Sequence, residues 1–474
     1  MDKKFYITTT APYVNADPHI GFALEIIQAD CVARFKRLQG FDVAFGFGTD
    51  EHGQKIYQKA LLAKKDPQKY CDEYAKKFDE LKIALNLSSN YFMRTTDPRH
   101  LEAAQEFWRL CDKNGDIYKK NYKLKYCIGC ELEKTDSELQ NGRCLIHPNL
   151  EIEILEEENY FFRFSKYQKN LLALYEKTPP FVVPAYRLEE IRSFVKKGLQ
   201  DFSISRLKSK MPWGVDVPGD PRHVMYVWFD ALVYYISTLG WPKNLKNFKD
   251  FWPGVQVAGK DNLRQQTAIW QAMLFSAGLP NSQQVFIHGF ITSSGQKMSK
   301  SLGNVINPFD LVSKYGTDAV RYYLLREIPA ADDGDFSFAR MEEIYNSDLA
   351  NELGNLVSRL TTLGEQDELN IGTATKEEFS SEIKKQFASF QFNIILEQLW
   401  TRIKDLNKKV DTFAPWNKTK DKRKDFLFQC FNILKSIAFH LQPFIPETAE
   451  KILQVTSGKI KKISPLFPRF SSVK

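Results

Sequence analysis

The chain has 474 residues, of which 43% are hydrophobic and 26% charged, with 66 Lys and Arg against 58 Asp and Glu and a formal net charge of +8. This composition excludes wholesale disorder, the length corresponds to roughly two to four domains, and the mild positive charge is compatible with a polyanionic partner. No stretch approaches the ~18 apolar residues of a membrane-spanning helix, and no signal-peptide core follows Met1. Seven cysteines do not make a disulfide scaffold, so we expect a cytoplasmic protein that does not associate with membranes.

The first fifty residues predict two strands and a helix. Residues 5–10 are β-branched and aromatic, typical of a buried strand. Apolar spacing predicts a helix from Phe22 to about Leu38, and residues 42–47 resemble a second strand. This order predicts parallel strands joined by a right-handed crossover. Ligands bind at the carboxyl ends of such strands, where His19 and Asp50 are expected.

The remaining chain changes character twice. Short strand-like segments and a cysteine cluster indicate an insertion over residues 116–225, after which strands are expected at 255–258 and 286–291. Beyond about Phe338 apolar residues recur every three to four positions, which predicts a packed helical bundle. Its expected helices are 349–363, 392–410 and 426–441. The fold class is therefore α/β, with a parallel sheet, an insertion and a helical bundle.

The first motif is Pro18-His19-Ile20-Gly21, between the first strand and its helix. Free backbone N–H groups at a helix start favour anions, and Gly21 lets a ligand approach the backbone closely. His19 can donate a hydrogen bond to a phosphoryl oxygen. Taken alone, these four residues are better explained by a loop histidine that caps a helix.

The second motif is Lys297-Met298-Ser299-Lys300-Ser301. Two ammonium groups with hydroxyls between them suit a mobile clamp on a pyrophosphate leaving group, although a solvated basic loop has the same composition. A His-Ile-Gly after the first strand and a Lys-Met-Ser-Lys-Ser after a late strand are together the two signatures of class I aminoacyl-tRNA synthetases.

Within that class, the chain resembles the methionyl-tRNA synthetases over essentially its whole length. The resemblance rests on these two signatures and on five further runs: residues 11–15, 48–53, 227–232, 259–261 and 315–323. It implies a Rossmann-type catalytic domain with a zinc-knuckle insertion, followed by an α-helical anticodon-binding bundle. The implied domains are 1–115 and 226–295 (the two catalytic halves), 116–225 (the insertion), 296–345 (the KMSKS loop and stem-contact region) and 346–474 (the anticodon-binding domain).

The resemblance also implies roles for single residues. Asp50 would pair with the ammonium group of methionine, and the methionine pocket would comprise Ala11, Tyr13, Asp50, Trp228, Ala231, Leu232, Tyr235 and Gln266. ATP would be held by His19, Gly21, Asp261, Lys297, Met298, Ser299, Lys300 and Ser301, of which His19, Lys297 and Lys300 would be catalytic. Judged without the motifs, Trp228 and Tyr235 would be assigned to an ordinary core.

A third constellation is Cys127-x2-Cys130-x13-Cys144-x2-His147. Two paired knuckles with four soft ligands are typical of a closed tetrahedral zinc site. The resemblance implies such a knuckle in the insertion, so we expect one structural Zn²⁺ per chain, together with Mg²⁺ accompanying ATP.

A fourth set lies in the helical region. Asn355 and Arg359 are four residues apart, hence on one helical face, and Trp416 follows the next long helix. The resemblance implies that these three residues read the anticodon of tRNA(Met). By chemistry alone, Arg359 would be a surface charge and Trp416 an inter-helix plug. The basic run 418–424 beside Trp416 is equally compatible with phosphate contacts and with a solvated helix face.

Two positions depart from the usual pattern of the family. Phe22 stands where the first signature usually has its second histidine, and Gln266 stands where a histidine is frequent. Phenylalanine cannot donate a hydrogen bond, so activation could slow by roughly 10²–10³-fold unless other donors compensate. Glutamine can still donate to a thioether, so methionine stays the expected amino acid.

The implied activity is ATP-dependent attachment of L-methionine to tRNA(Met) through a methionyl-adenylate, releasing AMP and diphosphate. One alternative is a catalytically weakened, synthetase-derived tRNA-binding protein, which Phe22 motivates and which Asp50 and Asp261 oppose. Another is activation of leucine, isoleucine or valine, but relatives with those substrates resemble much longer chains with an editing insertion. Because the chain ends soon after the helical bundle, we expect a monomer.

Overall fold

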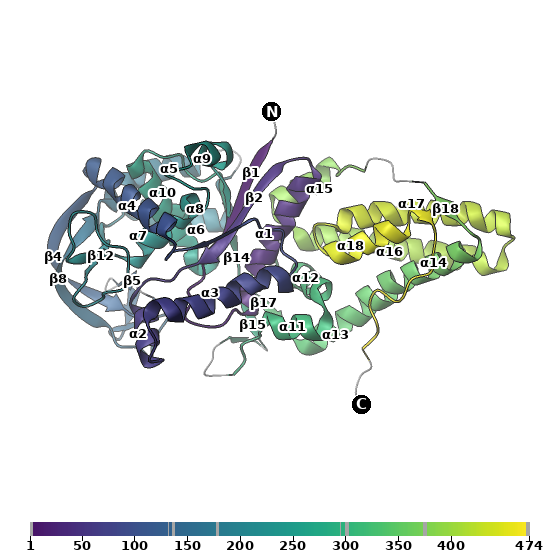
Figure 1. Cartoon of the computed structure of the whole chain (residues 1–474), viewed down its shortest axis with the longest axis horizontal. Coiled ribbons are helices and arrows are strands. Elements are labelled where there is room, and N and C mark those ends of the chain that lie inside the picture. The colour runs from purple at the N-terminus through teal and green to yellow at the C-terminus, as the bar shows by residue number, and fades with distance from the viewer. Residues whose placement is uncertain are drawn as a thin grey trace. The chain divides into compact units, whose positions relative to one another are not determined.

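The computed structural model describes residues 3–130, 132–134, 138–176, 180–293, 295–298, 303–372 and 377–470 (Figure 1). The chain divides into two compact units. The sheet unit comprises Met1–Pro18, Val43–Glu80 and Ser89–Ile287, and the helical unit comprises His19–Asp42, Leu81–Ser88 and His288–Lys474. Within the described ranges, no helix is long and apolar enough to cross a membrane.

The sheet unit is organised around a six-stranded sheet with the order β3-β2-β1-β13-β14-β9. Its strands are β1 (Lys4–Thr9), β2 (Asp42–Thr49), β3 (Tyr91–Arg94), β9 (Val182–Val183), β13 (Val255–Gly259) and β14 (Gln284–His288). The pairs β1–β13, β2–β3 and β14–β9 are parallel. Strands β1, β2 and β13 are buried almost throughout, as expected for a parallel sheet covered on both faces. The predicted α/β class and parallel sheet are confirmed.

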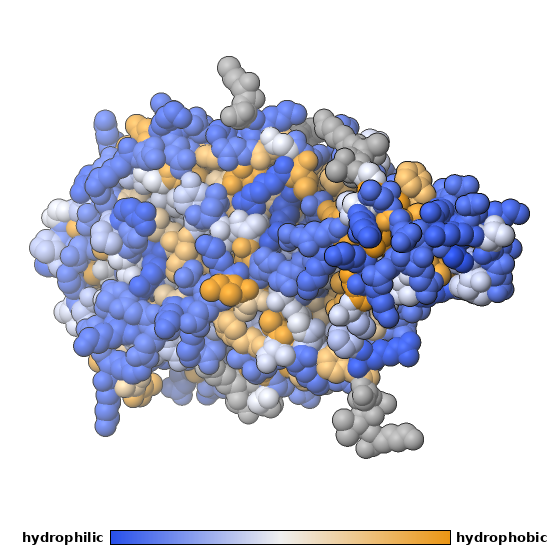
Figure 2. Space-filling model, turned by 45° about the vertical axis from the view of Figure 1, so that its right-hand side comes forward, coloured by the Kyte–Doolittle hydropathy of each residue, from blue (hydrophilic) through white to orange (hydrophobic). Residues whose placement is uncertain are grey.

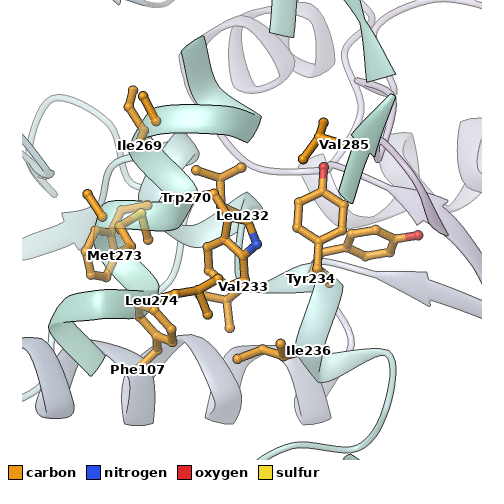
Figure 3. Packing of buried hydrophobic residues seen from close by; sticks show 14 of the residues in the cluster. Phe107, Leu232, Val233, Tyr234, Ile236, Ile269, Trp270, Met273, Leu274 and Val285 are labelled. Carbon is orange, nitrogen blue, oxygen red and sulfur yellow. The ribbon is translucent and has the colours of Figure 1, made fainter. Parts of the chain in front are cut away.

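Helices of this unit contribute much of its hydrophobic core. They are α2 (Gln54–Leu62), α3 (Pro67–Ala84), α4 (Pro98–Lys113), α5 (Gln168–Tyr175), α6 (Ala185–Lys196), α7 (Val227–Ala231), α8 (Tyr234–Ser237), α9 (Leu245–Phe251) and α10 (Trp270–Ala277). Three short helical segments accompany them: η2 (Phe164–Tyr167), η3 (Lys260–Asn262) and the π-helix η4 (Gln265–Ile269). Trp270 is completely buried and stacks on Phe107 of α4, with ring centroids 5.5 Å apart. Leu232, Val233 and Tyr234 gather around it (Figure 3), so segments α7 and α8 rest on a close-packed base.

The insertion contains longer strands than the sequence suggested. Strands β4 (Ile117–Cys127) and β8 (Glu153–Phe162) form an antiparallel ribbon from the pair Ile117–Phe162 to the pair Tyr126–Glu153. Two lysines of β4 form ion pairs with glutamates of β8: Nζ of Lys123 lies 3.0 Å from Oε2 of Glu156, and Nζ of Lys119 lies 3.6 Å from Oε2 of Glu158. Cross-strand charge pairing of this kind supports strands whose apolar pattern is weak, which explains why short segments were expected. The remaining strands here are β5 (Leu132–Glu133), β6 (Leu139–Gln140), β7 (Arg143–Cys144), β10 (Phe202–Ser203), β11 (Ser205–Leu207) and β12 (His223–Met225).

The helical unit confirms the predicted bundle. It contains α1 (Ile20–Leu38), α11 (Pro308–Tyr315), α12 (Thr317–Arg326), α13 (Phe338–Ile344), α14 (Asn355–Gln366), α15 (Ser381–Ala388), α16 (Phe392–Phe413), α17 (Lys420–Leu441) and α18 (Pro446–Val455). The helix predicted from residue 349 begins instead in the π-helix η6 (Tyr345–Gly354), which continues into α14. Strands β15 (Ile291–Ser293), β16 (Gln296–Lys297) and β17 (Gly334–Phe336) form a three-stranded sheet, and β18 (Asn370–Ile371) pairs with β19 (Gly458–Lys459).

A buried ion pair ties α1 into this unit. Nη2 of Arg321 lies 2.8 Å from Oδ2 of Asp30, and both side chains are completely buried. Arg321 also donates to the backbone oxygens of Leu85, Pro443 and Phe444. Burial alone would raise the pKa of Asp30, but the charges of Arg321 and Arg34 lower it, so the pair stays ionised.

On the face of the molecule shown in Figure 2, hydrophilic side chains predominate, with apolar ones scattered among them.

Candidate functional site

In the sheet unit, the chain segments directly after β1 and β2 are hydrogen-bonded to each other at the carboxyl-terminal edge of the sheet. Tyr13 and Asp50 form an isolated parallel bridge, in which the Asp50 N–H donates to the carbonyl of Pro12 at 2.9 Å. The Asp50 side chain is only 2% exposed. Ala11, from the same segment as Tyr13, packs against the main core of this unit. Two predicted pocket residues, Tyr13 and Asp50, are therefore neighbours, as the parallel topology requires.

The residue after Asp50 anchors this loop. The carboxylate of Glu51 is completely buried and accepts two hydrogen bonds from Arg94, at 2.7 and 2.8 Å. It also accepts hydrogen bonds from the hydroxyls of Thr49 and Thr96, each at 2.5 Å. Because four hydrogen bonds converge on this one buried carboxyl group, the loop has little freedom to change conformation.

A second anchor is a buried aspartate between two histidines. Asp230 of α7 lies 2.6 Å from Nδ1 of His52 and 2.7 Å from Nε2 of His100. Burial would raise the pKa of Asp230, but the neighbouring His52 and His100 outweigh this effect and lower it to about 2. Sequence reasoning assigned no role to Glu51, Arg94, His52, His100 or Asp230. Glu51, His52 and Asp230 do lie inside the runs that carried the resemblance, which was the available signal.

The remaining predicted pocket residues come from α7, α8 and the π-helix η4. Ala231, Leu232, Tyr235 and Gln266 are all buried. Nε2 of Gln266 donates a hydrogen bond to the hydroxyl of Tyr235, so the structure brings these two together. Trp228 is half-buried and lines a cavity of about 410 Å³, together with Phe194, Arg206, Arg264 and ten further residues. The indole Nε1 of Trp228 is buried and makes no hydrogen bond within the described chain.

The predicted ribose ligand follows the next parallel strand. Asp261 lies in η3, directly after β13, and is exposed to solvent. Nδ2 of Asn262 donates to its Oδ1 at 3.2 Å. An exposed carboxylate at the carboxyl end of a central strand is suitably placed to accept hydrogen bonds from a bound molecule.

In the helical unit, His19 caps helix α1. Its Nδ1 accepts a hydrogen bond of 3.0 Å from the N–H of Gly21, and a Cβ at Gly21 would lie 2.8 Å from Cε1 of His19. Since Nδ1 accepts, the proton of the neutral ring resides on Nε2 and makes it a donor. Desolvation by the surrounding protein lowers the pKa of His19 below its usual value, with Glu25 opposing the shift, which favours that neutral form.

The expectation of free backbone N–H groups at this helix start is wrong. The N–H of Ile20 donates to the carbonyl of Ile306, and the N–H groups of Phe22 and Ala23 donate to the carbonyl of His19. With Gly21 bonded to the His19 ring, the first turn has its donors engaged within the protein. Any anion contact here therefore depends on the His19 side chain rather than on the backbone.

The second signature begins at a turn held by Asp335. The carboxylate of Asp335 in β17 accepts from the hydroxyl of Thr292 at 2.7 Å and from the N–H of Gly295 at 2.8 Å. Lys297 belongs to strand β16, and its backbone pairs with that of Thr292 in strand β15. Met298 follows directly after β16. The predicted residues Ser299, Lys300 and Ser301, and the side chain of Lys297, lie outside what the structure describes.

The four predicted metal ligands converge. Sγ of Cys127, Cys130 and Cys144 and Nδ1 of His147 all lie within 4.8 Å of one another. Sγ of Cys130 is 3.4 Å from Sγ of Cys144 and 3.2 Å from Nδ1 of His147. A tetrahedral zinc with bonds near 2.3 Å needs ligand atoms roughly 3.8 Å apart, so the donor set and the spacing fit this ion. Gly129 is required here because a Cβ would lie 2.5 Å from Cγ of His147.

The predicted anticodon residues lie on one surface of the helical unit. Asn355 and Arg359 belong to α14, and Trp416 lies in the short segment η7 (Pro415–Asn417) after α16. The guanidinium carbon of Arg359 is 5.6 Å from the Trp416 ring centroid, and Nη2 of Arg359 is 2.6 Å from Oδ1 of Asp411. Trp416 is 53% exposed, so it is not an inter-helix plug.

In the basic run beside Trp416, one residue has a structural role. Nε of Arg423 donates to the carboxylate of Asp367 at 2.6 Å, and Asp367 is completely buried. Lys418, Lys420 and Lys422 are exposed. Arg423 therefore links α17 to the residue that ends α14, and the exposed lysines are the members of this run that can meet another molecule.

Comparison with known proteins identifies the family. Residues 5–138 and 129–361 match the model described as tRNA synthetases class I (M). Methionine–tRNA ligases from Thermotoga maritima and Synechocystis sp. are each 42% identical to this chain, over 97% and 95% of it and 76% and 89% of the relatives. The methionyl-tRNA synthetase of Mycobacterium tuberculosis, solved in complex with methionyl-adenylate, superposes with a TM-score of 0.91 at 36% identity, covering 98% of this chain and 100% of the other. The chain belongs to the family of class I tRNA synthetases (M).

Proposed function

We propose that this protein is a methionine–tRNA ligase, which uses ATP to activate L-methionine as methionyl-adenylate and transfers it to tRNA(Met), releasing AMP and diphosphate. The observation that carries the proposal is the buried carboxylate of Asp50 beside Tyr13, at the carboxyl ends of parallel strands in a member of this family. A buried anion at this place is suited to bind the substrate ammonium group.

In the first step the methionine carboxylate attacks the α-phosphorus of ATP and expels diphosphate. A carboxylate is ionised at neutral pH, so this attack needs no general base. Asp50 orients the amino group, while Ala11, Tyr13, Trp228, Ala231, Leu232, Tyr235 and Gln266 surround the side chain. Anchoring of the Asp50 loop by Glu51 and His52 supports this role, because catalysis by positioning requires a fixed geometry.

The phosphates of ATP are assigned to His19, Gly21, Lys297, Met298, Ser299, Lys300 and Ser301. His19 donates a hydrogen bond through Nε2, which carries the ring proton because Nδ1 accepts from the N–H of Gly21. Lys297 and Lys300 balance the negative charge that develops on the leaving group. Asp261 holds the ribose hydroxyls. Mg²⁺, when bound with ATP, supplies further charge neutralisation.

In the second step a ribose hydroxyl at the 3′ end of tRNA(Met) attacks the methionyl-adenylate. Selection of the tRNA is assigned to Asn355, Arg359 and Trp416, with an amide and a guanidinium for base edges and an indole for stacking. The exposure of Trp416 and its proximity to Arg359 support this role.

The knuckle of Cys127, Cys130, Cys144 and His147 is proposed to hold a structural Zn²⁺ that cross-links the turns of the insertion. We also propose the domain roles expected from the sequence: catalytic halves at 1–115 and 226–295, the insertion at 116–225, the KMSKS loop and stem-contact region at 296–345, and the anticodon-binding domain at 346–474. A monomeric state and a cytoplasmic location also stay predictions; sedimentation and cell fractionation test them.

The decisive experiment is ATP–pyrophosphate exchange with purified protein and each of the twenty amino acids, without tRNA. Exchange stimulated only by methionine is expected. If folded, zinc-containing protein exchanges with none of them, the activity is contradicted and a tRNA-binding role takes its place.

A further inference from the structure

A buried carboxyl group and a buried histidine meet in the helical unit. Oε2 of Glu25, on α1, lies 2.9 Å from Nε2 of His288, the last residue of β14, and both side chains are buried. Nδ1 of His288 lies 2.7 Å from the carbonyl oxygen of Gly289. A carbonyl only accepts, so Nδ1 carries a proton, and the contact with Glu25 places a second proton between Nε2 and Oε2. We call Glu25 and His288 the buried tie.

At one end, the buried tie holds the helix of the first signature. Glu25 lies on α1, which His19 caps. Desolvation lowers the pKa of His19, and the charge of Glu25 opposes that shift, so the two side chains are close enough to interact. One turn further along α1, Nε2 of Gln28 donates to the carbonyl of Ala330 at 3.1 Å. The place of His19 is therefore set by contacts along the body of this helix.

At the other end, the buried tie holds the base of the hairpin that carries the second signature. His288 is followed by Gly289 and Phe290, and β15 begins directly after them. The N–H of Phe290 donates to Oδ1 of Asp333 at 2.8 Å. A Cβ at Gly289 would lie 2.2 Å from the carbonyl carbon of Asp332, so this segment packs directly against the chain before β17. The base of the β15–β16 hairpin is therefore fixed next to His288.

We infer that the buried tie aligns the two signatures with each other, and that Glu25 and His288 are positioning residues for formation of the methionyl-adenylate. A tie with one end on α1 and the other at the base of the hairpin fixes where His19 and the hairpin lysines act together on the phosphates of ATP. Groups that stabilise a transition state are effective when they are held in place beforehand. The inference deepens the proposed function and rests on it.

The test uses Glu25→Gln and His288→Gln, and measures the single-turnover rate constant of methionyl-adenylate formation and the Kd of methionine without ATP. Misplacing a contact group by about 1 Å can cost about a hundredfold, so we expect this rate constant to fall about tenfold to a hundredfold. The Kd should stay within about twofold, because Asp50 belongs to the sheet unit. The double variant leaves no buried charge alone, so it should be less destabilised than either single variant and show a loss of the same size.

A double-mutant cycle separates positioning from a general loss of structure. In a His19→Ala background the first signature no longer contacts the phosphates, so its alignment with the hairpin matters less. Glu25→Gln should then lower the rate constant by less than about threefold. An equal loss in both backgrounds, or a Kd for methionine that weakens as much as the rate constant falls, would overturn the inference.

His440→Gln is the matched control. His440 is a buried histidine of the same unit, and its Nδ1 lies 2.7 Å from the carbonyl oxygen of Ser436 on its own helix, α17. This change should reduce stability without reducing the rate constant of adenylate formation. A loss as large as that in His288→Gln would overturn the inference, because it would show that any buried histidine of the unit has this effect. No adenylate formation by the unaltered protein would instead contradict the proposed function.

Discussion

The proposed methionine pocket and the proposed anticodon surface are built on opposite principles. In the sheet unit, the polar groups around the Asp50 loop are buried, and each has several partners; Glu51 alone accepts hydrogen bonds from Arg94, Thr49 and Thr96. In the helical unit, Trp416 is exposed, and Arg359 forms an ion pair with the exposed Asp411. A pocket that distinguishes small molecules depends on fixed dipoles, whereas a surface for a large polyanion uses groups that can adjust to it.

The strongest way to break this contrast is to neutralise the pocket. Asp50→Asn keeps the shape of the side chain but removes the charge proposed to pair with the methionine ammonium. Loss of one partner in a buried charge pair costs about 2–5 kcal/mol, so kcat/KM for methionine in pyrophosphate exchange should fall about thirtyfold or more.

Asp79→Asn is the control for this change, because Asp79 is an exposed carboxylate on α3 of the same unit. It should leave exchange within about twofold of the unaltered protein. Equal losses in both variants would mean that net charge, and not Asp50 itself, determines the rate.

The anchoring of the Asp50 loop can be tested through stability. Glu51→Gln places an amide among four donors and leaves Arg94 without its buried partner. Since Arg94 is partly exposed and retains Asp72, we expect the free energy of unfolding in urea to fall by about 2–3 kcal/mol. Asp72→Asn, on the exposed side of Arg94, should cost less than about 1 kcal/mol. Similar values for the two variants would contradict the assigned anchoring.

Acid should weaken the sheet unit through Asp230. Its folded pKa of about 2 lies below the ordinary value of about 3.9, so its contribution to stability is complete above pH 4 and is lost as the pH falls towards 2. The full contribution is about 2–3 kcal/mol. Urea unfolding at pH 5 and pH 3 should therefore show a smaller decrease for Asp230→Asn than for the unaltered protein. The same decrease in both would remove Asp230 from this account.

A substitution on the proposed anticodon surface should have the smallest effect, and it should affect only the transfer of methionine to tRNA(Met). Trp416→Ala removes a stacking platform worth about 1–3 kcal/mol, so kcat/KM for tRNA(Met) charging should fall about tenfold. Pyrophosphate exchange and stability should be unchanged, because Trp416 supports no core. Phe428→Ala, an exposed aromatic on α17, is a suitable control. A loss of pyrophosphate exchange in Trp416→Ala would contradict the assignment of amino acid activation and tRNA selection to different regions of the chain.

Sequence reasoning reached the groups whose position follows from topology or local spacing. Asp50 and Tyr13 meet because parallel strands end at one edge of a sheet, and the four predicted metal ligands meet because their spacing closes two turns. It missed Asp230 with His52 and His100, which join residues 178 and 130 positions apart. Such pairings depend on how α7 packs in three dimensions, and no local pattern reports them. The length of β4 and β8 was missed because charge pairs, rather than apolar alternation, support these strands.

The most direct test of the central claim measures both half-reactions on the same preparations of the unaltered protein, Asp50→Asn and Trp416→Ala. We predict methionine-dependent pyrophosphate exchange that is lost in Asp50→Asn and retained in Trp416→Ala, with tRNA(Met) charging reduced in both. Exchange in the unaltered protein that does not depend on methionine, or that survives in Asp50→Asn, would contradict the assignment of this pocket.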